Sequence, residues 1–350
     1  MMIGQSLYRT YKRYRTLQTD VIHSLPLVIL MPHSACNCRC IMCDIWKGNK
    51  HLKQLTESDI ESLLSSLARL GTQQVLMSGG EALLNQNFFT LCDLLKRQGL
   101  SVSLLSTGLT LAKHARQLIR YVDDIIVSLD GPGELHDRIR NIPGAYAQLR
   151  DGVNAIKRLQ PHFRIAARTV IHRHNYHSWK EIIRSAKDMG LDQISFLPAD
   201  VSSHAFNRET LWEKERQHQI LPAWEDLSPM KTMIEEIIGE FNGEMQTRFI
   251  AEPPEKLQRI YQYYSACHGL NVFPYKKCNA PWVSTVIEAD GTVRPCFFHA
   301  PLGNIHEQSL EEILNKKESV AFRKTLDMDI NATCVRCVCY LNLAPATHLK

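Results

Sequence analysis

The stretch Cys36-Asn37-Cys38-Arg39-Cys40-Ile41-Met42-Cys43 lies shortly after an apolar run, Leu25 to Met31. Cys36, Cys40 and Cys43 are spaced C-x3-C-x2-C, and Cys38 is an additional thiol inside the loop. Three thiolates on one loop can bind three irons of a 4Fe–4S cube and leave the fourth iron free, whereas a ferredoxin-type site supplies Cys to every iron. The pattern therefore favours a cluster that binds a further molecule, although clustered cysteines are also typical of zinc loops.

The three cysteines resemble the cluster loop of the radical S-adenosylmethionine (SAM) enzymes. The resemblance implies that the open iron of a 4Fe–4S cluster binds SAM. Reduction then yields methionine and a 5′-deoxyadenosyl radical, which abstracts hydrogen from a substrate. The family usually has an aromatic residue before the third cysteine. Here that residue is Met42, whose thioether can also pack on an adenine face.

Strand-like and helix-like stretches alternate from residue 25 onward. Continuous apolar strands separated by helices predict parallel strands that helices cover. Six such units fall short of the eight that close a full barrel, and the resemblance implies a partial (β/α)6 TIM-like barrel, an α/β fold. The expected strands are 27–31, 75–77, 102–105, 125–129, 164–171 and 193–197.

Functional residues of such folds lie at the carboxyl ends of the strands. Ser78-Gly79-Gly80-Glu81 follows the second strand, and in the family this glycine-rich backbone edge holds the SAM ammonium group. The resemblance places Ser128 and Asp130, after the fourth strand, near the ribose. It places Arg168, on the fifth strand, near the SAM carboxylate, although a structural ion pair explains that arginine equally well.

A second group of cysteines lies near the end of the chain. Cys278 and Cys296 flank two strand-like segments joined by Asp290-Gly291, a strong hairpin signal. A helix that Ser309 and Glu312 cap, extending to Leu326, then leads to a C-x2-C pair, Cys334 and Cys337.

These four cysteines resemble the SPASM/twitch extension of radical SAM enzymes, in which four cysteines ligate an auxiliary 4Fe–4S cluster. Only Cys339 follows the last pair, which favours the shorter twitch form with a single auxiliary cluster. Two cysteine pairs around a hairpin also describe a zinc-ribbon-like site. The sequence thus predicts a small C-terminal β-hairpin/helix iron–sulfur domain and leaves the roles of Cys38, Cys267 and Cys339 open.

The chain has 350 residues, of which 44% are hydrophobic and 22% charged, which suits one large domain with a smaller one. We expect a basic and aromatic segment over 1–24, the partial barrel over 25–200, a linking helical segment over 201–265 and the auxiliary cluster domain over 266–350. Eleven cysteines, an odd and clumped set, argue against a disulfide framework. The protein is expected to be cytoplasmic with reduced thiols, because its apolar runs are too short for a signal peptide or a membrane span.

The formal net charge of +5 is too small to indicate nucleic acid as a partner. Basic residues concentrate only in Tyr8–Arg15, where they alternate with aromatic ones, as in RNA-binding or membrane-surface segments. A helix lying across the barrel is the preferred interpretation of this short patch.

The resemblance implies an iron–sulfur oxidoreductase in which SAM and the cluster carry the chemistry, so we assign no catalytic side chain. We expect a low-potential electron donor such as flavodoxin or ferredoxin. Oxidation of a small polar molecule, sugar-like or cyclitol-like, is favoured, with the auxiliary cluster as electron acceptor, because residues 1–24 leave little room for a module that binds a peptide leader. The alternative is a SPASM enzyme that modifies a peptide or protein. An RNA-modifying enzyme or a non-catalytic zinc protein is more remote.

Overall fold

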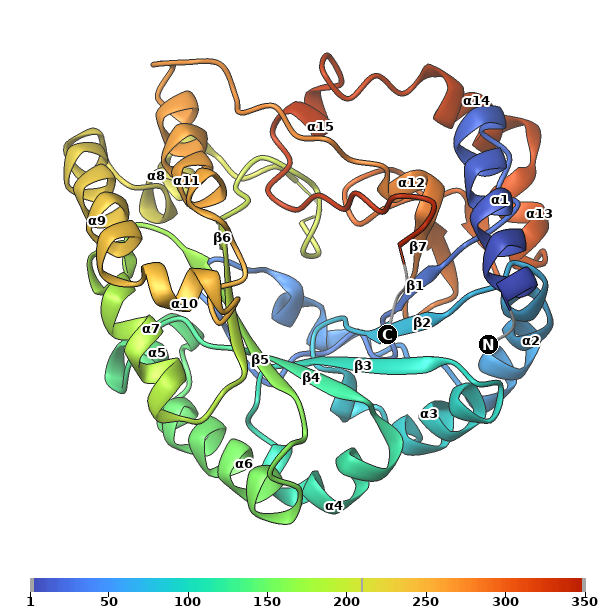
Figure 1. Cartoon of the computed structure of the whole chain (residues 1–350), viewed down its shortest axis with the longest axis horizontal. Helices are drawn as coiled ribbons and strands as arrows, with labels where there is room; N and C mark the ends of the chain where they lie inside the picture. Colours follow the sequence, from blue (N-terminus) through green and yellow to red (C-terminus); the bar gives the residue numbers. More distant parts are fainter. Residues whose placement is uncertain (1–2, 209, 348–350) are drawn as a thin grey trace.

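The protein is described by a computed structural model that covers residues 3–208 and 210–347. Its strands form one sheet in the order β6-β5-β4-β3-β2-β1-β7-β8-β9. The six strands expected from the sequence all form and pair in parallel. They curve into an open arc with helices on the outer side (Figure 1), which confirms the partial barrel. These strands are β1 Leu27–Leu30, β2 Gln74–Met77, β3 Ser101–Ser106, β4 Asp124–Ser128, β5 Ile165–Ile171 and β6 Gln193–Pro198.

Amphipathic helices cover the outside of the arc. The first of them begins at a capping box, in which Thr56 and Asp59 each accept a hydrogen bond from the other's backbone. Its apolar stripe, which includes Ile60, Leu63 and Leu67, is buried. The covering helices are α2 Glu57–Arg69, α3 Phe88–Arg97, α4 Leu111–Tyr121, α5 Glu134–Arg140, α6 Ala145–Leu159 and α7 Trp179–Asp188, with short 3-10 turns η1 Ile45–Lys50, η2 Ala82–Leu84 and η3 Tyr176–Ser178.

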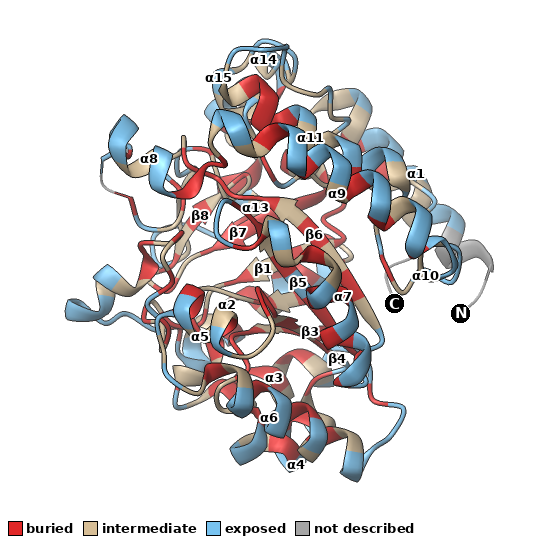
Figure 2. Cartoon of the chain, turned by 90° about the vertical axis from the view of Figure 1, so that its left-hand side faces the viewer, coloured by how far each residue is buried: buried red, intermediate tan, exposed pale blue. Residues whose placement is uncertain are grey.

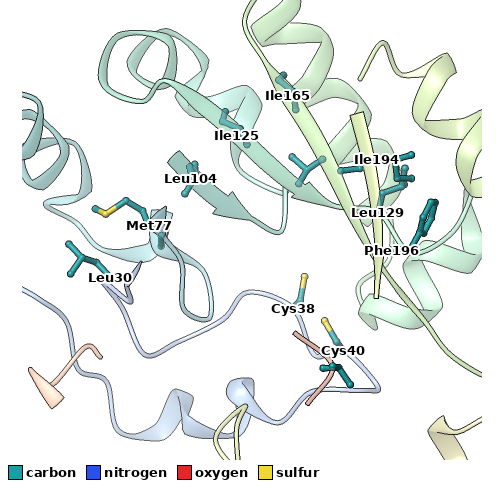
Figure 3. Packing of buried hydrophobic residues seen from close by; sticks show 14 of the residues in the cluster. Leu30, Cys38, Cys40, Met77, Leu104, Ile125, Leu129, Ile165, Ile194 and Phe196 are labelled. Atoms are coloured by element: carbon teal, nitrogen blue, oxygen red, sulfur yellow. The ribbon is translucent and has the colours of Figure 1, made fainter. Parts of the chain in front are cut away.

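The two faces of the strands have different environments, because successive side chains of a strand point to opposite sides. Val28 and Leu30 are fully buried. Figure 2 shows the buried parts of the strands in red, and Figure 3 shows the Leu30 side chain among other buried residues. Leu27 and Ile29, from the same strand, line a cavity inside the arc. The interior of this barrel is therefore a binding space rather than a packed core.

The C-terminal hairpin extends the barrel sheet. β7, Ser284–Ile287, pairs in parallel with β1, and β8, Thr292–Arg294, and β9, Gly303–Asn304, follow in antiparallel order. The prediction of one helix from Ser309 to Leu326 is wrong, because the structure has two helices there. Lys316 is extended, with φ −61° and ψ 158°, and separates the two. The helices of this region are α12 Ala280–Val283, α13 Leu310–Asn315, α14 Lys317–Thr325 and α15 Ala332–Val335.

The linking segment packs against the far end of the sheet. Ile250 forms a parallel bridge with Ile194 of β6, and the buried Tyr264 hydroxyl accepts a hydrogen bond from Ala199 N at 2.8 Å. These contacts cover the edge of β6, which would otherwise offer unpaired backbone groups. The segment contains α8 Lys214–Ile220, η4 Trp224–Asp226, α9 Leu227–Glu240, α10 Asn242–Gln246 and α11 Pro254–Cys267.

The basic N-terminal segment is part of α1, Ile3–Thr19, which lies against α12. Arg13 is buried and donates hydrogen bonds to the side chain of Gln73 and to the carbonyl of Thr347. This confirms a structural role for at least one cation of the patch. Within the described residues, no helix has the length and apolar character needed to cross a membrane.

Candidate active site

Both groups of cysteines face one cavity. It has a volume of about 860 Å³, lies inside the arc, and is lined by residues from the carboxyl ends of the strands and from the C-terminal region. This volume falls in the range of about 300–1,000 Å³ that is typical of ligand sites. All seven cysteines expected to bind iron belong to its wall, namely Cys36, Cys40, Cys43, Cys278, Cys296, Cys334 and Cys337.

The first cysteine loop is held by backbone hydrogen bonds rather than by regular secondary structure. Arg39 N donates to Arg140 O and Ile41 N donates to Ile139 O, both at 3.0 Å, so the loop pairs with the end of α5. The Asn49 side chain accepts from Cys36 N and donates to Cys36 O. Hydrogen bonds therefore hold the backbone of the loop at Cys36, Arg39 and Ile41.

Cys38 does not line the cavity. It is 1% exposed and belongs to the hydrophobic core, beside the loop position of Cys40 (Figure 3). Hydrogen bonds to the sulfurs of Cys36 and Cys40, together with burial, raise the pKa of Cys38 strongly. The hydrogen bond from Cys38 and the Arg140 charge lower the pKa of Cys40 to about 7. Three of the four thiols of the loop thus line the cavity, and the fourth is buried next to them.

This donor set fits an iron–sulfur cube. A cube distributes its ligands over separate irons. We therefore infer that Cys36, Cys40 and Cys43 would hold such a cluster with one iron open to the cavity.

Ser78, Gly79 and Gly80 line the cavity, as expected, and also support the cysteine loop. Glu81 N donates to Ala35 O at 2.9 Å, and a Cβ at Gly80 would lie 2.2 Å from that same oxygen. Gly79 has a φ of +114°, which side chains rarely tolerate. The glycines are thus required by the close approach of two backbones.

The Glu81 carboxylate does not face the cavity. It is fully buried and accepts hydrogen bonds from Thr107 N at 2.7 Å, from Leu83 N at 3.2 Å and from the Ser106 hydroxyl. Burial raises its pKa, which these donors oppose. Glu81 therefore fastens the loop after β2 to the end of β3. Sequence reasoning missed Ser106 and Thr107, for which the only signal was a polar pair at the end of an apolar strand.

We predict that Gly80→Ala reduces cluster content, because the new methyl group displaces the backbone of Ala35 next to Cys36. The effect is expected on iron binding and not merely on SAM affinity. Gly239→Ala in α9 is the matched control, since a Cβ there meets open space. Iron content after anaerobic reconstitution checks this. Full iron content in the Gly80 variant would show that the two loops do not constrain each other.

Asp130 differs from its expected role beside the ribose. Its side chain is fully buried, accepts a hydrogen bond from Val170 N at 3.0 Å and forms an ion pair with Arg140 at 2.5 Å. Arg140 in turn donates to Cys40 Sγ at 3.5 Å and lines the cavity. Asp130 thus acts on the site through Arg140, because both carboxylate oxygens are engaged away from the cavity.

We predict that Arg140→Met destabilises the protein by about 3–5 kcal/mol, because it leaves Asp130 buried without its charge partner. A double variant that adds Asp130→Asn should recover part of this loss. Arg138→Met, an exposed cation on the same helix, is the control. The midpoint of urea unfolding is the measurement. Equal midpoints for the Arg140 and Arg138 variants would contradict the pairing.

Met42, Ser128 and Arg168 all line the cavity, as the sequence predicts. Arg168 is exposed to this space, and its Nε donates to the Ser195 hydroxyl at 3.3 Å. Among the residues that the structure describes, no carboxylate lies within 4 Å of its guanidinium group. Glu252 interacts with Arg168 electrostatically without a direct ion pair, and Arg168 lines the cavity that a ligand carboxylate would enter.

The second cysteine group is assembled by the C-terminal tail. The Asn279 backbone N donates to Leu341 O at 2.7 Å, and the Lys276 ammonium donates to Val335 O at 3.2 Å. These bonds bring Cys278 to the segment that carries Cys334 and Cys337. Burial raises the pKa of Cys334 to about 11, and His299 Nε2 lies 3.3 Å from its sulfur. His299 had no recognisable signal in the sequence.

The linking segment, for which the sequence favours a plain helical spacer, supplies a further wall of the cavity. Phe206 lines it and packs against Phe297 with ring centroids 5.1 Å apart. Nearby, Trp212 Nε1 donates to Asp44 Oδ2 at 2.7 Å, which ties the segment to the cysteine loop. The spacer predicted for this stretch is therefore part of the site.

Comparisons with known proteins agree with this geometry. The family model of the radical SAM superfamily matches residues 30–186, and the SPASM model, an iron–sulfur cluster-binding domain, matches residues 278–338. The chain belongs to the radical SAM superfamily. This radical SAM protein is an enzyme that uses a 4Fe–4S cluster and SAM, and its SPASM domain carries auxiliary iron–sulfur binding.

Two curated relatives and one solved structure illustrate the range of similar proteins. The chain is 24% identical to the AdoMet-dependent heme synthase of Methanosarcina barkeri over 84% of this chain and 82% of that protein. It is 22% identical to the sporulation killing factor maturation protein SkfB of Bacillus subtilis over 80% of this chain, but spans only 62% of SkfB. Streptococcus suis SuiB bound to S-adenosylmethionine shares the fold, with a TM-score of 0.66, 12% identity and coverage of 95% of this chain and 78% of SuiB.

Proposed function

We propose that this radical SAM protein modifies a peptide or protein substrate. The observation that carries the proposal is an exposed apolar rim on the cavity. Val272 and Tyr275 belong to the cavity wall but are 87% and 66% exposed. Exposed apolar residues that border a cleft are typical of surfaces that bind another chain. A small molecule held inside the cavity would leave this rim uncovered.

The character of the wall does not support the expected sugar or cyclitol substrate. Phe206, Phe297 and Phe298 form an aromatic cluster in the wall, with Phe297 and Phe298 centroids 5.8 Å apart. A polyol would need a hydrogen-bonding partner for each hydroxyl to offset its desolvation. An apolar wall suits the side chain of a peptide better, and the similarity to SkfB, a maturation protein, supports the same class.

The cofactors supply the radical chemistry when bound, by reductive cleavage of SAM next to the first cysteine loop. The residues of the chain position and protect this step. Arg140 orients Cys40, the Ser78–Gly80 backbone offers its edge to the ligand, and the aromatic cluster excludes water. A donor such as flavodoxin or ferredoxin and a cytoplasmic location remain part of the proposal.

We further propose a single auxiliary cluster, held by Cys278, Cys296, Cys334 and Cys337. The cysteine inventory supports this number. Cys38 and Cys92 are buried in the core, which leaves only Cys267 and Cys339 unassigned. Two cysteines are too few to ligate every iron of a second auxiliary cube.

A carboxylated tetrapyrrole is the second candidate substrate. The heme synthase of Methanosarcina barkeri is matched along 82% of its length, so the two chains have a similar extent. A flat macrocycle would also fit an apolar, aromatic wall. The exposed rim of Val272 and Tyr275 favours the peptide.

Isotope transfer separates these classes. The reduced enzyme is incubated with SAM and with perdeuterated pools, one of peptides, one of cyclitols and sugars, and one of porphyrins. We expect deuterium to appear in 5′-deoxyadenosine with the peptide pool alone. Transfer from the porphyrin pool alone, or from the sugar pool alone, would contradict the proposal and assign the other class.

A further inference from the structure

A second, smaller cavity adjoins the first and is strongly basic. It has a volume of about 430 Å³ and its wall contains Lys256, Arg259 and Lys277. Lys256 and Arg259 come from the first turns of α11, and Lys277 precedes the ligand Cys278. We call this cavity the basic pocket. Three cations around one small space form a site for negative charge, since an anion between them is attracted by all three.

Within the described residues, the cations of the basic pocket form no direct ion pair with a carboxylate. Over residues 3–208 and 210–347, none of the three lies within 4 Å of a carboxylate. Arg259 Nη1 donates to the Tyr340 hydroxyl at 3.5 Å, and Lys256 lies 5.2 Å from the centre of the same ring. Glu252 interacts electrostatically with Arg168 and, more weakly, with Lys256; it is half-buried, and burial raises its pKa to about 7. It therefore offsets only part of one positive charge.

The basic pocket and the main cavity share part of their walls. Tyr275, Tyr340 and Leu341 line both. Tyr275 is also a member of the exposed rim, so a chain that crosses the rim from the main cavity reaches the three cations directly. One ligand can thus occupy both spaces, with its reacting part near the clusters and a charged group beyond the two tyrosines.

We propose that the basic pocket binds a carboxylate of the substrate, an acidic side chain that lies beside the residue to be modified. This rests on the proposed peptide function. Arg and Lys bind carboxylates by charge-assisted hydrogen bonds, which are stronger than neutral ones. The small, concave shape fits a side chain rather than the flat surface of a redox partner. The pocket would therefore select acidic peptides and fix their register in the main cavity.

The test compares peptides that differ only in charge. Pools of fluorescent octapeptides with two fixed Glu residues are titrated against the reconstituted enzyme with SAM, alongside pools with two Gln residues. Anisotropy is expected to show about tenfold tighter binding of the Glu pool, from charge-assisted hydrogen bonds. The preference should vanish in the triple variant Lys256→Gln, Arg259→Gln, Lys277→Gln.

A matched variant removes three charges elsewhere. This second triple variant is Lys113→Gln, Arg116→Gln, Arg120→Gln. The three residues lie on the exposed face of α4, away from both cavities, so the variant should keep the preference for Glu. Iron content and thermal midpoint confirm that both triple variants are folded. The proposal would be overturned if the triple variant of Lys256, Arg259 and Lys277 kept the preference for Glu. Equal binding of the Glu and Gln pools by the parent enzyme would also overturn it.

Coproporphyrin and its methyl ester distinguish failure of the pocket from failure of the peptide function. Suppose that neither peptide pool binds but that coproporphyrin binds more tightly than its ester. If this difference disappears in the triple variant of Lys256, Arg259 and Lys277, the basic pocket is confirmed as a carboxylate site. The proposed peptide function is then wrong. If neither peptide pool binds and the acid and the ester bind with equal affinity, both proposals are overturned.

Discussion

Replacing Cys36, Cys40 or Cys43 with Ala is expected to abolish formation of 5′-deoxyadenosine. Each of these thiols lines the cavity, whereas Cys38, the other thiol of the loop, does not. Thiolates are the ligands of such clusters. The loss should therefore reach the detection limit and not a partial level. Dithionite-reduced enzyme with SAM, analysed by chromatography, gives the measurement.

Cys38→Ala is the matched control within the same loop. Its side chain lies in the core, so its removal is expected to lower stability by about 1 kcal/mol, through a small cavity, while SAM cleavage persists. The pattern of three inactive variants and one active variant follows only if the cluster lies on the cavity side. Normal cleavage by the Cys40 variant, or loss of cleavage by the Cys38 variant at full iron content, would contradict the assignment.

Cys296→Ala is expected to uncouple SAM cleavage from product formation. Loss of one auxiliary ligand should remove about four irons, those of one cube, and stop product formation, whereas SAM cleavage at the first loop continues. Folding and metal binding are coupled where the ligands come from distant segments. Hydrogen exchange should consequently increase over residues 278–338 and remain unchanged in α6, which packs against α4 and α5.

Cys339→Ala provides the comparison for this second prediction, because Cys339 lines the cavity but is not among the four proposed ligands. The Cys339→Ala variant should keep both clusters and still form product. If Cys339→Ala loses iron and Cys296→Ala does not, the auxiliary ligand set is wrong. If both lose the auxiliary irons, a five-cysteine site replaces the proposed four.

The sequence predicted the barrel because its signals are local. Each strand is a short apolar run, and the capping boxes at Thr56 and Ser309 mark where helices begin. Cysteine spacing is equally local, since three thiols on eight residues must face a common region. These features need no knowledge of distant contacts, and the structure confirms them.

The remaining features depend on contacts between distant segments. Pairing of β7 with β1 joins residues more than 250 positions apart, and no local pattern encodes it. The carboxylates of Glu81 and Asp130 were placed near SAM because their motifs lie at strand ends. Their partners, Thr107 and Arg140, turn them away from the cavity, and only the packed structure shows this.

The account depends most on two clusters that share one cavity. Iron, sulfide and zinc analysis of the anaerobically purified protein, together with the Cys36→Ala, Cys40→Ala, Cys43→Ala triple variant, tests this directly. We predict about eight irons in the intact protein and about four in the triple variant, since each cube contains four. One zinc and no iron in the triple variant would contradict the account and leave a one-cluster enzyme with a structural zinc site.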